Sequence, residues 1–280
     1  MRTFGIYGYE CTNEIKAMSF RIVPFSKDIK LTREKSRKED VYELTAFVEV
    51  DDCSVDDLDQ FLFDLEAILT FVEHRSVIIN NELFVHESMN DLPKDFPTKI
   101  FGNLRVSGGG HVIHSDYMKP NSRGDFIELA LSSLGSNVTR ASFFRVVESI
   151  KGSSNFIDVR YYLQFSALES LCRHEVNMKS GSVVTAISKY LNSHGFDVYE
   201  HMDKSNLHKS IGSYSALRNA LFHNASLSAE VNIDNEIFTL ELTDFSYSFG
   251  ALVSLVLIKH IGFDDGCINW SAWLDRMMFK

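Results

Sequence analysis

The chain has 280 residues, 45% of them hydrophobic and 24% charged, a composition typical of a globular protein with one large domain or two of ordinary size. Its formal net charge of −10 argues against a general nucleic-acid coat protein, because such proteins are normally basic. The charge does not exclude an RNA enzyme that has a local basic site.

Two further features indicate the compartment. The four cysteines form no CxxC pair, and the first residues contain no apolar targeting core. The most apolar run, 249–258, stops at Lys259 and is too short to span a bilayer. We therefore expect a cytoplasmic protein that does not contact a membrane.

The first 120 residues predict a strand-rich domain. They contain all four prolines, at positions 24, 93, 97 and 120. Segments of strand length that are rich in β-branched and aromatic residues span 3–9, 17–25, 42–51, 76–86 and 99–107. Between them, the charged segment 28–40 is predicted to be a solvated loop. One long helix is expected after the capping box Ser54–Asp57, since apolar residues follow at helical spacing from Leu58 to Val72.

The second half predicts helices. No proline follows Pro120, and turn-forming residues at 119–124 mark a boundary, so the expected domains are 1–122 and 123–280. Helices are predicted at 125–134, 138–151, 156–176, 181–194, 207–225 and 244–262, and 231–242 could form a short hairpin. The segment 156–176 is apolar around much of its circumference, which is typical of a central helix in a bundle. The predicted fold class is α+β, with a helical bundle as the second domain.

Arg218 and His223 are the most informative pair of side chains. They lie five positions apart on the helix predicted at 207–225, followed and preceded by apolar residues. On a straight helix their Cα atoms differ by about 140° in direction, a gap that the long arginine side chain can close. Arginine supplies a permanent charge and histidine a proton-transfer group near neutral pH, so the pair could act on one phosphate.

The segment Arg218-Asn219-Ala220-Leu221-Phe222-His223 resembles the Arg-(four to six residues)-His signature of the HEPN superfamily. The upstream segment 165–171, with Glu169 at its centre, is similar to the glutamate-bearing helix of ApeA-like HEPN proteins of bacterial phage defence. The order of a strand-rich region followed by a helical domain also agrees. The resemblance covers residues 120–280 and implies an all-α HEPN-type bundle.

The resemblance implies a metal-independent endoribonuclease without a cofactor, which acts as a homodimer with two motifs facing each other. His223 would be base or acid, Arg218 would stabilise the transition state, and Asn219 would orient the imidazole or bind the phosphate. Cleavage, with tRNA as one possible substrate, would serve abortive-infection antiphage defence. The N-terminal domain would sense a phage-derived trigger or bind a regulatory partner.

Several residues allow more than one interpretation. Glu169 could support Arg218 or pair with Arg173 one turn later. Arg173, Lys209 and His208 are predicted to contact RNA, although solvated helix ends would explain them equally well. His111 and His114 are two histidines without a third ligand, so no metal site is predicted. The glycine run 108–110 lacks the lysine of a P-loop and is read as a tight turn.

A second functional class remains open at this point. A non-catalytic HEPN module that binds nucleotide, RNA or a partner protein would carry the same motif. In a nuclease, the Arg218 and His223 side chains should be accessible to solvent. A pair buried within one chain would favour binding.

Overall fold

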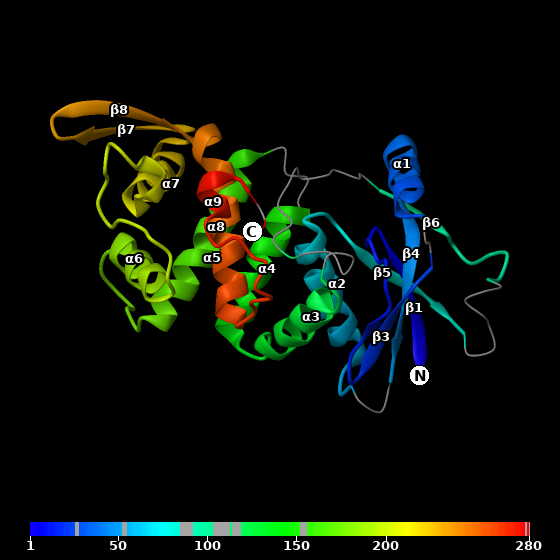
Figure 1. The fold of residues 1–280 in the computed structure, drawn as a ribbon. Helices are drawn as coiled ribbons and strands as arrows, with labels where there is room; N and C mark the ends of the chain where they lie inside the picture. The colour runs from blue at the N-terminus through cyan, green and yellow to red at the C-terminus, as the bar shows by residue number, and fades with distance from the viewer. Residues whose placement is uncertain are drawn as a thin grey trace. The chain divides into compact units, whose positions relative to one another are not determined.

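The computed structural model describes residues 1–25, 28–51, 55–84, 92–102, 113, 119–151, 156–277 and 279 (Figure 1). The chain divides into two compact units, Met1–Ser132 and Ser133–Lys280. A mainly antiparallel sheet belongs to the first unit and most helices belong to the second, so the α+β class is confirmed.

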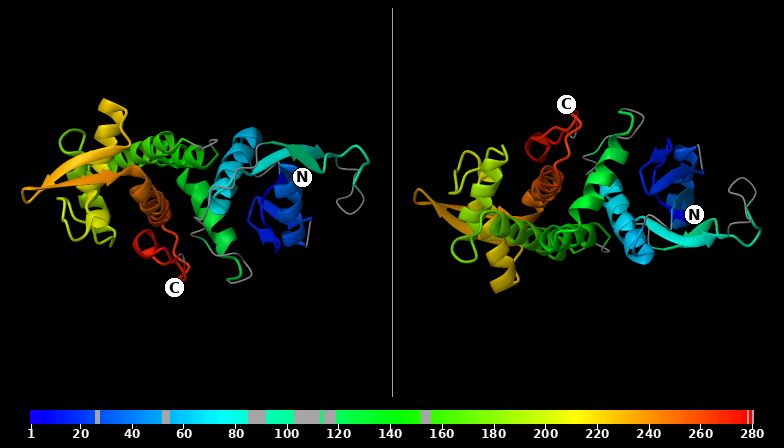
Figure 2. Two further views of the ribbon diagram at one scale, coloured as in Figure 1. Left: turned by 90° about the horizontal axis from the view of Figure 1, so that it is seen from above. Right: turned by 90° about the horizontal axis from the view of Figure 1, so that it is seen from below.

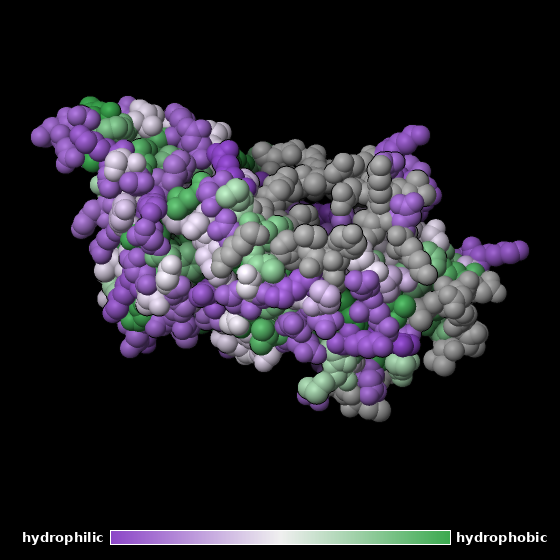
Figure 3. Space-filling view, viewed as in Figure 1, coloured by the Kyte–Doolittle hydropathy of each residue, from purple (hydrophilic) through white to green (hydrophobic). Residues whose placement is uncertain are grey.

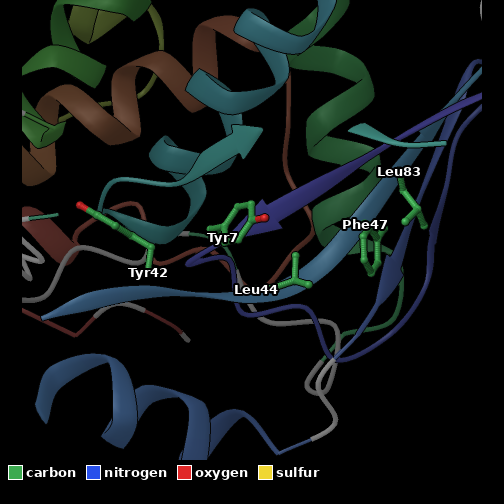
Figure 4. Packing of buried hydrophobic residues seen from close by; sticks show 5 residues of the cluster. All are labelled: Tyr7, Tyr42, Leu44, Phe47 and Leu83. Atoms are coloured by element: carbon green, nitrogen blue, oxygen red, sulfur yellow. The ribbon is translucent and has the colours of Figure 1, made fainter. Parts of the chain in front are cut away.

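The first unit is built on an antiparallel sheet, and its described strands fall in the predicted segments except for β2 (Ile15–Lys16), which precedes the segment predicted at 17–25. In the described residues the strand order is β2-β3-β4-β1-β5, and β6 pairs with β4. The strands are β1 (Arg2–Tyr7), β2 (Ile15–Lys16), β3 (Phe20–Pro24), β4 (Val41–Val50), β5 (Ile78–Leu83) and β6 (Lys99–Phe101). Buried side chains of β1, β4 and β5 form a cluster with the segment 92–100 (Figure 4), namely Tyr7, Tyr42, Leu44, Phe47 and Leu83.

Two helices of this unit bear on the helix predicted from Leu58 to Val72 and on the loop predicted at 28–40. The long helix is confirmed as α2 (Leu58–Glu73), and its N-cap is Asp57, whose side chain accepts a hydrogen bond from the Gln60 amide. Ser54 of the proposed capping box lies outside the described residues. The solvated loop predicted at 28–40 is wrong, because this segment is the helix α1 (Ile29–Glu39). Its many Lys, Arg and Glu residues are good helix formers, which the loop prediction undervalued.

The helix α3 (Ser122–Ser133) lies mostly in the first unit, so the compact units divide ten residues after the boundary expected at 122 (132 − 122). Arg123 explains this placement. Its guanidinium is buried and lies 2.8 Å from the buried Glu73 carboxylate at the end of α2. Burial by itself lowers the pKa of Arg123. The neighbouring Tyr9 and Glu73 raise the pKa by more than burial lowers it, so the guanidinium stays charged. The ion pair attaches the start of α3 to the first unit.

The second unit contains the predicted helices except the one at 125–134, which is α3. They are α4 (Asn137–Lys151), α5 (Ile157–Glu175), α6 (Val183–Ser193), α7 (Ile211–Asn224) and α8 (Leu242–Ile261), with the one-turn η2 (Leu207–Lys209) and the short α9 (Ala272–Asp275). The strands β7 (Ser228–Ile233) and β8 (Glu236–Glu241) form a hairpin that projects from the helices (Figures 1 and 2). The all-α description of this domain is therefore wrong, and the hairpin considered at 231–242 is present.

Aromatic packing places α7 against α5 and α8. The Phe249 ring of α8 has its centroid 4.8 Å from that of Tyr161 and 5.0 Å from that of Tyr214. The Tyr161 hydroxyl donates to the Tyr214 carbonyl at 2.7 Å, so α5 and α7 are also joined by a buried hydrogen bond. These contacts determine which face of α7 is covered and which is left for the motif.

The helix α8 is the one described helix whose length and composition would allow it to cross a membrane. Its most apolar window has a mean hydropathy of 1.3, but 67% of that window is buried inside the protein. A core helix has the same properties, so this is weak evidence for a membrane segment. The cytoplasmic location stays a prediction.

Candidate functional site

The motif lies in the last two turns of α7. Of the apolar residues between Ser215 and Phe222 on this helix, Leu217 is buried, whereas Ala220 and Leu221 are half-buried. The helix ends at Ala225, which adopts a left-handed conformation with φ 49° and donates to the Leu221 carbonyl. The chain then reverses, so that β7 runs back beside the helix that carries His223.

The guanidinium of Arg218 is held from several sides. Its Nη2 lies 3.8 Å from Glu169 Oε2 on α5, and its Nη1 donates to Asn219 Oδ1 at 3.1 Å. The guanidinium carbon also lies 4.9 Å from the centroid of the Phe222 ring, within range of a cation–π interaction. The side chain remains 31% exposed. Arg218 is thus oriented and still accessible to a phosphate.

Glu169 contacts both arginines that the sequence left as alternatives. While one carboxylate oxygen faces Arg218, the other lies 2.8 Å from Arg173 Nε. Arg173 also donates to the carbonyls of Met178 and Gly181 in the loop after α5. Its guanidinium therefore holds this loop and Glu169 together.

His223 is exposed and borders an open pocket of about 530 Å³. Among the described residues its ring nitrogens make no hydrogen bond, so both are available for proton transfer. Two small side chains on α7, Ala216 and Ala220, also line the pocket. Polar residues on either side of the turn after α7 complete it, including Asn219, Asn224, Ser226, Ser228 and Glu230.

Arg218 is not among the residues that line this pocket. Within one chain it faces Glu169 and α5, whereas His223 faces the hairpin. Asn219 connects the two because its side chain accepts from Arg218 and also borders the His223 pocket. The three motif residues are therefore neighbours on one helix end, but only Asn219 and His223 line the pocket.

The other residues predicted to contact RNA are at the opposite end of α7. Lys209 and His208 lie in η2, before the helix begins. The Lys209 ammonium pairs with Asp197, and the His208 ring stacks on Phe245 with centroids 4.4 Å apart. Burial lowers the pKa of His208 and Arg276 lowers it further, against the opposing effect of Asp244. The structure does not bring these two residues together with Arg218 and His223.

The second depression beside the motif is an apolar groove of about 830 Å³ between the start of α5 and the end of α7. Ile157 and Leu221 in its lining are half-buried, and five other large side chains are 43% to 65% exposed, namely Phe156, Val159, Tyr162, Phe222 and Leu227. The Tyr162 and Phe222 rings pack against each other at a tilt of 55°, with centroids 4.8 Å apart. Sequence reasoning missed this groove because its residues come from distant segments and form no motif.

Other candidates do not add to the site. His111, His114 and the glycine run 108–110 lie outside the described residues. Within the described part of the chain, no three His, Cys, Asp or Glu residues are grouped so as to hold a metal ion. Comparison of the chain with protein-family models, curated proteins and solved structures finds no match.

Proposed function

We propose that this protein is a metal-independent endoribonuclease of the HEPN type, with the second unit as its nuclease domain and Arg218, Asn219 and His223 as its site. One observation carries the proposal. A guanidinium oriented by Glu169 lies on the same helix end as an exposed, unbonded imidazole, and Asn219 connects the two. A fixed cation beside an accessible proton-transfer group is what phosphodiester cleavage requires.

The cleavage follows from RNA's own 2′-hydroxyl. A base, such as His223, removes the 2′-proton, the 2′-oxygen forms a bond to phosphorus, and the bond from phosphorus to the 5′-oxygen breaks. The leaving 5′-oxygen takes up a proton from an acid. Arg218 stabilises the negative charge that develops on the phosphate oxygens. The products are a 2′,3′-cyclic phosphate and a 5′-hydroxyl.

The active form is proposed to be a homodimer through the second unit. In one chain, Arg218 faces Glu169 on α5 and does not line the pocket that His223 borders, so a single copy offers each phosphate an incomplete site. The apolar groove borders Phe222, the residue over which Arg218 lies. A second copy that covers this groove would bring its own motif close to the first.

The biological role is proposed from the resemblance to ApeA-like proteins. RNA cleavage, with tRNA among the substrates, would arrest growth during phage infection. The first unit would restrain the nuclease and respond to a phage-derived trigger. Overexpression should then be toxic, and loss of His223 should relieve the toxicity.

Incubation with total RNA in the presence of EDTA tests the nuclease. We expect Arg218→Ala and His223→Ala each to reduce cleavage by about 100-fold or more, the range of a lost acid–base or charge-stabilising group. His194→Gln, a histidine change elsewhere in the same unit, should retain activity. Cleavage that EDTA abolishes, or full activity in both motif variants, would contradict the proposal.

The second candidate function is a non-catalytic HEPN module that binds nucleotide, RNA or a partner protein. It is favoured by the separation of Arg218, which faces Glu169, from the pocket that His223 borders. RNA binding that depends on Arg218, without any cleavage product, would support this alternative.

A further inference from the structure

The pocket beside His223 contains an acceptor that the proposed chemistry does not use. Glu230, on β7, borders the pocket, and its side chain is exposed. Among the described residues it makes no ion pair or hydrogen bond, so both carboxylate oxygens have free lone pairs. Thr239 lies directly opposite it on β8.

The charge of Glu230 limits what the pocket can bind. A carboxylate repels a phosphate, and the cation of the motif faces the other side of the helix end. The hairpin that carries Glu230 also bears Asp234, Glu236 and Glu241, and its surface is mainly hydrophilic (Figure 3). The part of the pocket beside Glu230 therefore suits an uncharged group rich in hydrogen-bond donors rather than a phosphate.

A nucleobase fits this description in size and chemistry. The pocket, of about 530 Å³, lies within the usual range of small-ligand sites. Ala216 and Ala220 leave room beside the helix, while the side chains of Asn219 and Asn224 offer amide groups. Proteins that read single-stranded RNA bind splayed bases along their Watson–Crick edges.

We propose that this pocket binds a base next to the cleaved bond and that Glu230 selects guanine. Guanine alone among the four RNA bases presents two adjacent N–H donors, N1–H and the N2 amino group, on its Watson–Crick edge. Two carboxylate oxygens can accept both in a bidentate arrangement. Uracil places carbonyls on either side of its single donor, and those carbonyls would face the carboxylate. This inference rests on the proposed nuclease function and narrows its substrate to RNA with guanosine next to the cleaved bond.

The test uses short single-stranded RNAs that differ only in the nucleotides flanking one central bond. We expect the wild-type protein to cleave bonds flanked by guanosine about tenfold faster than those flanked by uridine, as a bidentate contact allows. Glu230→Gln places an amide N–H against a guanine donor and should abolish the preference. Asp234→Asn removes the same charge from the turn of the same hairpin, away from the pocket, and should preserve it.

A binding measurement separates this inference from the nuclease itself. His223→Ala protein is titrated with uridine hexamers that carry one central guanosine or one inosine, which lacks the N2 amino group. We expect guanosine to bind about tenfold more tightly than inosine, and the additional change Glu230→Ala to remove the difference.

The outcomes are distinct. Cleavage without a guanosine preference, or a preference unchanged in Glu230→Gln, overturns the base site and leaves the nuclease standing. If guanosine binds more tightly than inosine in a way that depends on Glu230, but the wild-type protein cleaves no RNA, the nuclease proposal is overturned and the base site stands. Equal binding of the two hexamers overturns the assignment of Glu230.

Discussion

Glu169 is partly buried, with 23% of its side chain exposed, and lies between two arginines. One carboxylate oxygen is 2.8 Å from Arg173 Nε and the other is 3.8 Å from Arg218 Nη2. Such a pair at the surface contributes at most about 1 kcal/mol to stability. Its importance is positional, because the carboxylate keeps the Arg218 guanidinium near Asn219 and over Phe222. The motif therefore depends on a residue about 50 positions upstream in the sequence (218 − 169 = 49).

We predict that Glu169→Gln lowers RNA cleavage by about tenfold while it changes the free energy of unfolding by less than about 1 kcal/mol. The physical reason is that Arg218 loses its ionic partner and samples more orientations. Cleavage rates and urea denaturation measure the two effects. Glu175→Gln removes an exposed carboxylate from the same helix and is the control. Equal activity of the two variants would show that Glu169 does not position Arg218.

At the scale of elements, His260 joins three helices of the second unit. Its Nε2 lies 2.9 Å from the Thr139 hydroxyl on α4, and its Nδ1 lies 3.0 Å from the Tyr190 hydroxyl on α6. Burial lowers the pKa of His260; Glu175 raises it, and His194 and His174 lower it. The net effect is a lowered pKa, so the folded protein favours the neutral imidazole.

This shift predicts a pH dependence of stability. The unfolded chain, with a histidine pKa of about 6.5, binds the proton before the folded chain does, so acidification favours unfolding. The contribution of neutral His260 to the free energy of unfolding is complete above about pH 6.5. It is lost as the pH falls through the lowered pKa of the folded state. We expect the stability difference between wild type and His260→Gln to narrow between pH 7.5 and pH 5.5, as measured by urea denaturation. His201→Gln, an exposed histidine, should follow the wild type, and a constant difference for His260→Gln would refute the assignment.

At the scale of the whole molecule, the apolar groove is the feature that an isolated chain leaves exposed. Large side chains from the start of α5, the end of α7 and the turn after α7 share it, and five of them are more than two-fifths exposed. Exposed apolar patches of this kind mark interaction surfaces in soluble proteins. In the proposed nuclease, a second copy would cover the groove and align the two motifs.

We predict that Val159→Glu weakens dimerisation by about 100-fold or more and reduces cleavage in parallel, because a carboxylate would be buried in an apolar interface. Sedimentation equilibrium measures the first effect, and RNA cleavage at the same concentrations measures the second. Ile237 is 74% exposed on the hairpin and outside the groove, so Ile237→Glu is the matched control. A wild-type protein that cleaves RNA as a monomer, or a dimer that Val159→Glu leaves intact, would exclude this interface.

The sequence by itself determined the helices of the second unit, the strands of the first and the position of the motif on a late helix. These features are local, because helical spacing, β-branched segments and capping residues act over a few positions. The prediction of a loop at 28–40 was wrong for a local reason as well. The charged residues were taken as a sign of a solvated loop, although Lys, Arg and Glu also favour a helix.

Only the tertiary structure decided what surrounds the motif. Three features depend on how α5, α7 and the hairpin pack. They are the two arginine partners of Glu169, the facing of Arg218 toward α5 and of His223 toward the hairpin, and the presence of Glu230 in the same pocket as His223. The groove likewise joins 156–162 to 221–227, segments about 60 residues apart. Periodicity predicts which face of a helix is apolar, but it does not predict which distant side chains that face will meet, because packing between elements sets those contacts.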